Sequence, residues 1–249
     1  MFKAIYPNAK DFFSFIGSIT KVTDTITLNF TEEGIFSRHL TEDKVLMALI
    51  RIPKDVLSEY TIEKPISIKL DVTTVKKVIA KAKSKKATIE LSETDSGLKI
   101  VIRDEKSGAK STIYAKAEKG DVEQLTEPKV SLSVNFTVDE KILNVIAADM
   151  ALIGEEMIIS TEEDKIKIEV DEEGKRYTAF LVKDKPLKEL NIDSSASSSY
   201  SIEMFKDAVA GLRGFSAPVS VGFGNNLPMK LDVEATAGGH MIFWIAPRL

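Results

Sequence analysis

Few side chains in this sequence are spaced for catalysis. Adjacent carboxylates, which can serve as a general acid and a general base, occur at Glu32-Glu33, Glu162-Glu163 and Glu172-Glu173, and each pair falls in a predicted turn. The two histidines, His39 and His240, lie near the end and at the start of predicted strands, where a structural role is the simpler interpretation. Cysteine is absent, which excludes a thiol nucleophile, a disulfide and a cysteine metal site. We therefore predict no catalytic residue, no metal site and no cofactor.

The glycines do not form a loop that could cradle a phosphate. Gly211, Gly214 and the Gly222–Gly224 segment fit turns and match neither GxxxxGK[ST] nor GxGxxG. The motifs HExxH and GxSxG are also absent. One enzymatic alternative stays open, a carboxylate-dependent hydrolase built on a duplicated scaffold. An activity that survives lysine-to-alanine changes but is lost with a single acid would favour it.

The charge distribution points to a polyanion as partner. The net charge of −4 argues against a protein that coats nucleic acid with its whole surface. Segment Lys69–Lys86 nevertheless holds seven lysines and a single acid, whereas Glu118–Glu127 is acidic. A basic zone on an acidic body suits contact with a polyanion over one surface only. No apolar run is long enough to span a membrane, and the first residues carry no apolar signal region.

Short amphipathic helices are predicted to position these cations. We expect helices over Ala9–Val22, capped by Asn8, over Thr73 or Thr74 to Ala82, over Val138–Met150 and over Met204–Leu212. The second helix has an apolar face and a basic face, formed respectively by Val75, Val78, Ile79 and Ala82 and by Lys76, Lys77, Lys81 and Lys83. The fourth repeats this pattern with Lys206 and Arg213. A basic face that recurs favours phosphate contact over an ordinary solvated surface.

Strands on short turns make up most of the remaining sequence, which indicates antiparallel sheets and an α+β fold. The predicted strands are Met1–Tyr6, Thr25–Phe30, Ile35–Leu40, Val45–Ile52, Ile66–Leu70, Ala87–Leu91, Leu98–Arg103, Ser111–Ala117, Val130–Phe136, Glu156–Ser160, Lys165–Val170, Arg176–Val182, Tyr200–Glu203, Val219–Phe223, Pro228–Ala235 and His240–Ala246. Segment Lys183–Ser199 is interpreted as a polar link.

The two halves of the chain repeat each other at an offset of about 130 residues. Weak matches recur in order, among them Val75–Ala80 with Phe205–Ala210 and Ile89–Leu91 with Val219–Val221. Segment Glu118–Pro128 lies between the halves. We predict two duplicated domains, 1–117 and 129–249, joined by a connector over 118–128.

Three short motifs carry a resemblance to a known family. They are Asp121–Leu125 (DVEQL), Leu152–Glu155 (LIGE) and Trp244–Pro247 (WIAP). With these motifs the whole chain resembles the archaeal form of the sliding DNA clamps of the proliferating cell nuclear antigen (PCNA) family. The resemblance implies a non-enzymatic processivity factor in the cytoplasm of an archaeon, with two helices per domain, assembled into a ring around double-stranded DNA.

The resemblance also implies a DNA-facing set of side chains on the helices that line the ring. By position these are Lys10, Lys21, Lys76, Lys77, Lys81, Lys83, Lys141, Lys206 and Arg213. The third helix departs from the family pattern, because it carries Asp139, Glu140 and Asp149 against only Lys141.

A docking pocket for partner peptides is implied in the same way. Its apolar positions are Leu40, Met47, Leu125, Pro228, Trp244, Ala246 and Pro247, which could otherwise be ordinary packing residues. Family members bind a Gln-x-x-aliphatic-x-x-aromatic-aromatic segment there. The partners so implied are DNA polymerase, flap endonuclease, DNA ligase and the clamp loader, with no membrane contact.

Ring closure is expected from two strand edges. By the repeat offset, strand Val45–Arg51 corresponds to Arg176–Val182, and Ser111–Ala117 corresponds to His240–Ala246. If Val45–Arg51 borders His240–Ala246 within a chain, the other two strands become free edges, and Ser111–Ala117 of one subunit would pair with Arg176–Val182 of the next in a head-to-tail contact. The interface residues predicted on these strands are Ser111, Ile113, Tyr114, Tyr177, Ala179 and Leu181. Family rings hold three chains. Whether they are identical, or whether this subunit works only in a mixed ring of homologous clamp subunits, stays open.

Overall fold

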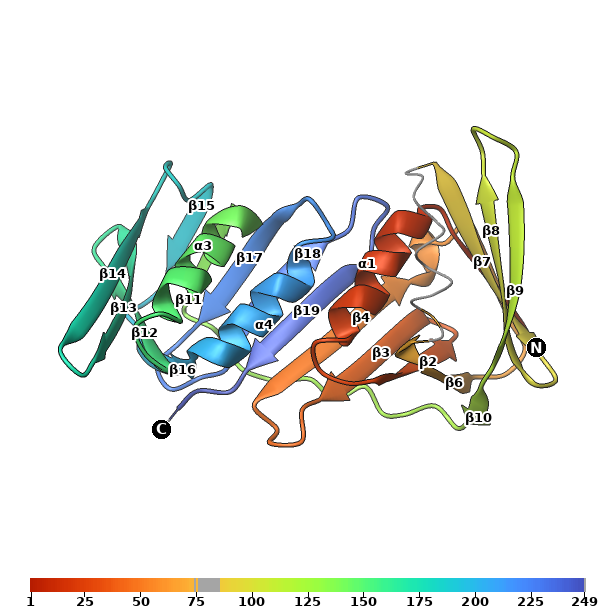
Figure 1. Cartoon of the computed structure of the whole chain (residues 1–249), viewed down its shortest axis with the longest axis horizontal. Helices are drawn as coiled ribbons and strands as arrows, with labels where there is room; N and C mark the ends of the chain where they lie inside the picture. Colours follow the sequence, from red (N-terminus) through yellow and green to blue (C-terminus); the bar gives the residue numbers. More distant parts are fainter. Residues whose placement is uncertain (74, 76–85, 249) are drawn as a thin grey trace. The chain divides into compact units, whose positions relative to one another are not determined.

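The structure is a computed structural model that describes residues 1–73, 75 and 86–248 (Figure 1). The chain forms two compact units. The first unit comprises Met1–His39, Ala48–Thr126 and Glu234–Met241, and the second comprises Leu40–Met47, Glu127–Val233 and Ile242–Leu249. Each unit therefore contains a short segment from the opposite half of the sequence.

The elements confirm the predicted α+β class. The first half forms β1 (Phe2–Tyr6), α1 (Ala9–Ile19), β2 (Thr25–Thr31), β3 (Gly34–Leu40), β4 (Leu46–Pro53), the 3₁₀ helix η1 (Lys54–Val56), β5 (Glu59–Ile62), β6 (Ile66–Asp71), β7 (Ala87–Thr94), β8 (Gly97–Asp104), β9 (Lys110–Lys116) and β10 (Glu118–Gly120). The second half forms β11 (Val134–Asp139), α3 (Glu140–Met150), β12 (Glu156–Glu162), β13 (Lys165–Glu172), β14 (Lys175–Val182), β15 (Glu189–Ile192), β16 (Ser197–Ser201), α4 (Ile202–Leu212), β17 (Pro218–Phe223), β18 (Met229–Glu234) and β19 (His240–Ile245).

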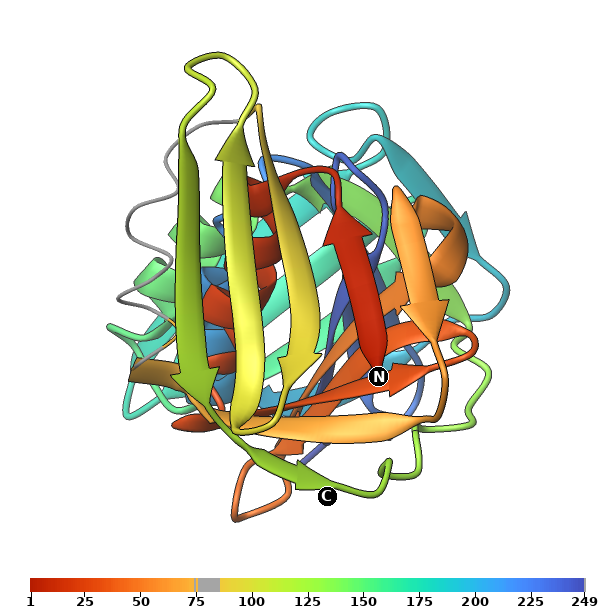
Figure 2. The ribbon, with the colours of Figure 1, turned by 90° about the vertical axis from the view of Figure 1, so that its right-hand side faces the viewer.

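Sheet topology confirms the duplication. In the first half, the strands lie in the orders β5-β1-β7-β8-β9 and β6-β2-β3-β4, and Figure 2 shows the first of these sheets face on. In the second half, the orders β15-β11-β17-β18-β19 and β16-β12-β13-β14 repeat both arrangements. Neighbouring strands run antiparallel, for example β1 with β5 and β11 with β15. Strands with equivalent places in the two repeats thus have equivalent partners.

Helix α1 begins where the sequence predicts and ends earlier. The Asn8 side chain accepts a hydrogen bond from the Asp11 amide at 3.2 Å, which caps the first turn. The helix ends at Ile19 and not at Val22, because the Lys21 amide bonds to Ser18 O and the Val22 amide to Ile19 O. These three-residue steps tighten the last turn and stop the α-helical ladder.

Side-chain caps also set the start of α3 and α4. The Asp139 carboxylate accepts from the Lys141 amide at 2.9 Å, and the Ser201 hydroxyl accepts from the Met204 amide at 3.4 Å. The strand predicted over Tyr200–Glu203 is therefore wrong in its second half, since Ser201 ends β16 and Ile202 already belongs to α4.

Buried aromatic side chains fill the core of each unit. In the first unit Phe2 stacks on Phe30 with ring centroids 3.8 Å apart, and the Tyr6 hydroxyl donates to Gly238 O at 2.6 Å. In the second unit the buried Tyr200 hydroxyl donates to Leu227 O, also at 2.6 Å. Each buried phenol thus has the hydrogen-bond partner that burial requires.

Candidate functional site

Most of the predicted pocket residues lie in the second unit. Leu40, Met47, Pro228, Ala246 and Pro247 are each partly exposed there. The Ala246 amide donates to Val45 O at 2.8 Å, which brings the C-terminal segment beside the segment that carries Leu40 and Met47. Partly exposed apolar side chains of this kind can accept the anchors of a bound peptide.

Trp244 is the most enclosed of the predicted pocket residues. Its side chain is only 5% exposed, and its indole Nε1 donates to Glu127 Oε1 at 2.9 Å. The Lys230 ammonium lies 5.7 Å from the Trp244 ring centroid and 3.2 Å from Asp232 Oδ2. The ring is therefore fixed by one hydrogen bond and one cation–π contact.

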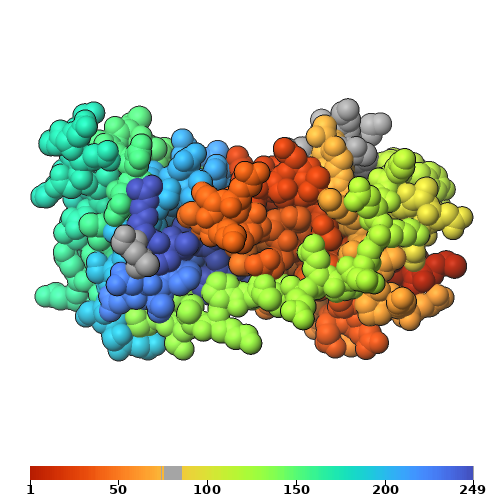
Figure 3. Space-filling view, turned by 90° about the horizontal axis from the view of Figure 1, so that it is seen from below, coloured from red at the N-terminus to blue at the C-terminus, as the bar shows by residue number. Residues whose placement is uncertain are grey.

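Leu125 lies in the first unit, among apolar residues of that unit. It is 38% exposed and lines a depression of about 260 Å³ together with Ile35, Phe36, Ile52 and Pro53. Figure 3 shows the connector that carries Leu125 as a continuous strip on the surface.

The connector is tied to β2 and β3 by two polar contacts. The Glu123 amide donates to Asn29 Oδ1 at 3.0 Å, and Arg38 Nε donates to Thr126 O at 2.8 Å. Sequence patterns do not single out Asn29, Arg38 or Glu127, because each acts on a segment far away in the chain.

The predicted DNA-facing cations are distributed over the described helices. Lys10 is partly exposed on α1, and Lys21 is exposed just beyond its end. Lys141 and Lys206 are exposed on α3 and α4, which pack against each other. The four lysines of the second predicted helix, Lys76, Lys77, Lys81 and Lys83, lie outside the described residues.

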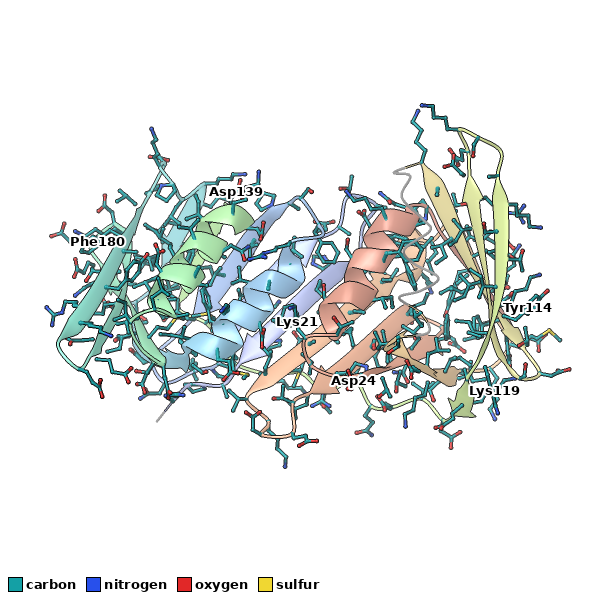
Figure 4. All side chains as sticks on the ribbon, in the orientation of Figure 1. Lys21, Asp24, Tyr114, Lys119, Asp139 and Phe180 are labelled. Atoms are coloured by element: carbon teal, nitrogen blue, oxygen red, sulfur yellow. The ribbon has the colours of Figure 1, made fainter. Side chains whose placement is uncertain are left out.

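Arg213, the C-cap residue of α4, is held against α3. Its Nε donates to Asn144 Oδ1 at 2.8 Å and lies 3.8 Å from Glu140 Oε1. Burial raises the pKa of Glu140, and the nearby Arg213 charge opposes that shift. Asp139, labelled at the start of α3 in Figure 4, is the N-cap residue of that helix, and its carboxylate accepts the Lys141 amide bond.

The two strands predicted to form subunit contacts each end a sheet. Strand β9 is the last strand of the order β5-β1-β7-β8-β9, and β14 is the last of β14-β13-β12-β16. Along β9, Tyr114 points outward and is 69% exposed, while Ile113 is only partly exposed and Ser111 is exposed (Figure 4). Along β14, Tyr177 and Ala179 are partly exposed and Leu181 is buried. Each strand thus offers an edge to another chain.

Comparison with known proteins gives the family. Residues 1–124 match the family described as "Proliferating cell nuclear antigen, N-terminal domain". The chain is 81% identical over 249 residues to "DNA polymerase sliding clamp 1" of Saccharolobus solfataricus, and the match covers all of both proteins. The chain belongs to the PCNA family of sliding clamps.

Further matches agree with this assignment. The sliding clamp is 53% identical over 249 residues to "DNA polymerase sliding clamp 2" of Sulfurisphaera tokodaii, again with full coverage of both chains. Its fold is also that of the PCNA crystal structure from Thermococcus kodakaraensis, with a TM-score of 0.89, full coverage of both chains and 20% sequence identity. The family and fold named from the sequence motifs are thereby confirmed.

The acidic pairs lie at turns in this sliding clamp, as the sequence predicts. Glu162 pairs with Lys165 at 3.4 Å, and Glu32, Glu33 and Glu173 are exposed near turns. Among the described residues, no group of three or more His, Asp or Glu side chains could hold a metal ion. Within the same part of the chain, no helix is long and apolar enough to cross a membrane.

Proposed function

We propose that this sliding clamp closes head-to-tail into a ring of three subunits around double-stranded DNA, where it holds a DNA polymerase and catalyses no reaction itself. The observation that carries the proposal is that β9 and β14, one in each unit, both end their sheets. An edge strand leaves a row of backbone N–H and C=O groups without a ladder partner, and pairing with another chain satisfies them. In this proposal the domains are 1–117 and 129–249, joined by the connector over 118–128.

The DNA contacts proposed for the ring are electrostatic. Lys10, Lys21, Lys141, Lys206 and Arg213 would meet phosphates, together with the four lysines at 76, 77, 81 and 83. Lysine acts as a point charge and reads no base sequence, so such a ring could move along the duplex.

A mixed ring of homologous subunits is the second candidate, and the charges on the two edges favour it. Strand β9 carries Lys110 and Lys116, and β14 carries Lys175 and Arg176. In antiparallel pairing the Lys116 end of β9 would approach the Lys175 end of β14, where like charges repel. Arg176 is paired with Asp171, which reduces this repulsion without removing the Lys175 charge.

Retention on circular DNA tests the ring. The clamp, loaded by its clamp loader, should stay on a nicked circular plasmid during gel filtration and should be lost once the plasmid is cut to a linear form. The chain should be tested alone and together with homologous clamp subunits. Equal retention on circular and linear DNA would contradict encirclement, and hydrolysis of the DNA by the pure protein would favour the enzymatic alternative.

Partner peptides are proposed to dock on the apolar residues predicted from the sequence, which are Leu40, Met47, Leu125, Pro228, Trp244, Ala246 and Pro247. A peptide helix with aliphatic and aromatic anchors suits such a surface, and flap endonuclease, DNA ligase and the clamp loader are the proposed partners besides the polymerase.

We expect a fluorescent Gln-x-x-aliphatic-x-x-aromatic-aromatic peptide to bind the chain and to lose at least about tenfold in affinity in a Leu125→Ala, Trp244→Ala double variant, since hot-spot side chains contribute more than about 1 kcal/mol each. Fluorescence anisotropy measures the affinity. Phe180→Ala, an exposed aromatic on β14, is the matched control and should bind as the wild type does. Equal binding by the double variant would refute the pocket.

A further inference from the structure

The connector has little secondary structure of its own to fix its path. After β10 ends at Gly120, residues 121–126 form no regular element, and of their side chains only Val122 is partly shielded from solvent while the others are exposed. A segment without a ladder or a core remains in one conformation only where specific contacts hold it, because ordering each residue costs about 1–2 kcal/mol of conformational entropy.

Asn29 supplies the first of these contacts from inside the sheet. The residue lies near the end of β2 and is 0% exposed. Its Oδ1 accepts from the Glu123 amide at 3.0 Å, and its Nδ2 lies 3.5 Å from Phe36 O. Because the side-chain oxygen of this buried residue accepts a hydrogen bond from the connector, it fixes the position of residue 123 relative to the sheet.

Arg38 supplies the second contact from the neighbouring strand β3. Its Nε donates to Thr126 O at 2.8 Å. The guanidinium is planar and its donors have fixed directions, so this bond restricts the orientation of the Thr126 carbonyl as well as its distance. Strands β2 and β3 are paired next to each other, with Asn29 opposite Phe36.

The two hydrogen bonds bracket Leu125. One holds residue 123 and the other holds residue 126, and between them the Leu125 side chain lines the apolar depression formed by Ile35, Phe36, Ile52 and Pro53. Leu125 itself has no polar group that could fix its direction. Its direction therefore follows from its apolar neighbours in the depression and from the backbone on either side of it.

We propose that Asn29 and Arg38 are positioning residues for partner docking, because they hold the connector so that Leu125 presents its side chain in one orientation. The inference rests on the proposed docking function. The two residues act through Leu125 and do not touch the peptide. Without the two bonds, part of the binding free energy would be spent on ordering residues 121–126, and the apparent affinity would fall by that amount.

The experiment uses the full chain and two readouts. Arg38→Met keeps most of the aliphatic stem and removes the donor, and Asn29→Leu replaces the amide by an apolar group of similar size. Hydrogen exchange of the amides at residues 121–127 reports the connector, and anisotropy of the peptide described above reports docking. Each variant should speed exchange at the Glu123 amide or its neighbours and weaken peptide binding by about three- to tenfold, the equivalent of one hydrogen bond.

A double-mutant cycle separates positioning from a general loss of structure. Because Arg38 acts through Leu125, the losses of affinity from Arg38→Met and Leu125→Ala should not add, whereas independent losses would. Arg103→Met, on β8 of the same unit, removes an arginine that pairs with Glu90 at 3.5 Å and should change neither readout. Arg38→Lys keeps a donor on a long stem and should recover part of the lost affinity.

The outcomes distinguish this inference from the docking function on which it rests. A wild-type chain that binds no peptide overturns both. A wild type that binds, with Arg38→Met and Asn29→Leu variants that bind equally well, overturns the positioning role alone. Faster connector exchange with fully additive losses in the cycle also overturns it, because the two residues would then act independently of Leu125.

Discussion

Replacing Tyr114 by aspartate should prevent subunit assembly while leaving the fold of the subunit intact. Tyr114 is 69% exposed on the outward row of β9, so the substitution removes no core packing. At a strand-to-strand interface, by contrast, the new carboxylate would lose water and the interface would lose the tyrosine ring, which together cost at least about 2–3 kcal/mol. The dissociation constant of the assembly should therefore rise by roughly 100-fold. Sedimentation velocity, with the chain alone and mixed with homologous clamp subunits, measures the change.

The opposite edge of the same sheet provides the control for this variant. Thr61 lies on β5, the other terminal strand of the order β5-β1-β7-β8-β9, and is also exposed. Thr61→Asp adds the same charge to the same sheet and should assemble as the wild type does. Assembly of Tyr114→Asp at wild-type concentrations would show that β9 is not the contact strand.

Local patterns in the sequence predicted much of the fold. The Asn8 cap and the apolar stripe of α1 predict the start of that helix because both signals come from residues that are close together in the sequence. The weak repeat predicted equivalent strands in the two halves, and the matching sheet orders follow from it. Both signals are internal to the chain and need no knowledge of long-range contacts.

Three short edge strands, β5, β10 and β15, could not be predicted from the sequence for a physical reason. Strands β5 and β15 alternate between exposed and partly exposed residues, and all three residues of β10 are exposed. These strands hold only three or four residues, which is too short for a period of two to be told from chance, so only their backbone pairing reveals them. Segment Lys183–Ser199, interpreted as a polar link, contains β15 for this reason.

The charges on α3 show how a sequence count can mislead. The sequence sets Asp139, Glu140 and Asp149 against Lys141, which predicts an acidic helix face. The side chain of Glu140 is only 14% exposed, however, and its Oε1 lies 3.8 Å from Arg213 Nε. The Asp139 carboxylate caps the start of the helix. The surface that α3 presents is therefore less acidic than the residue count implies. The pairing with Arg213 could not be predicted, because it joins two helices about 70 residues apart in sequence.

His39 should make the stability of the subunit depend on pH below neutrality. Burial, with a smaller effect of the Arg38 charge, lowers the pKa of His39 from 6.5 to about 4. Its Nε2 accepts from the Thr27 amide at 3.3 Å and lies 3.0 Å from Ser37 Oγ, and a protonated ring could no longer accept the amide bond. Above pH 6.5 the ring is neutral in both the folded and the unfolded chain, so its contribution to stability is then fully present.

As the pH falls from 6.5 to 4, the unfolded chain binds a proton at His39 that the folded chain does not, so the free energy of unfolding should drop by up to about 3 kcal/mol. Below pH 4 both states are protonated and this dependence ends. Urea unfolding of the wild type and of His39→Gln at a series of pH values tests the expectation, since the variant should lose this slope, and His240→Gln reports what the other histidine contributes. An unchanged slope in His39→Gln would show that carboxylates, and not the partly buried imidazole, account for the loss of stability in acid.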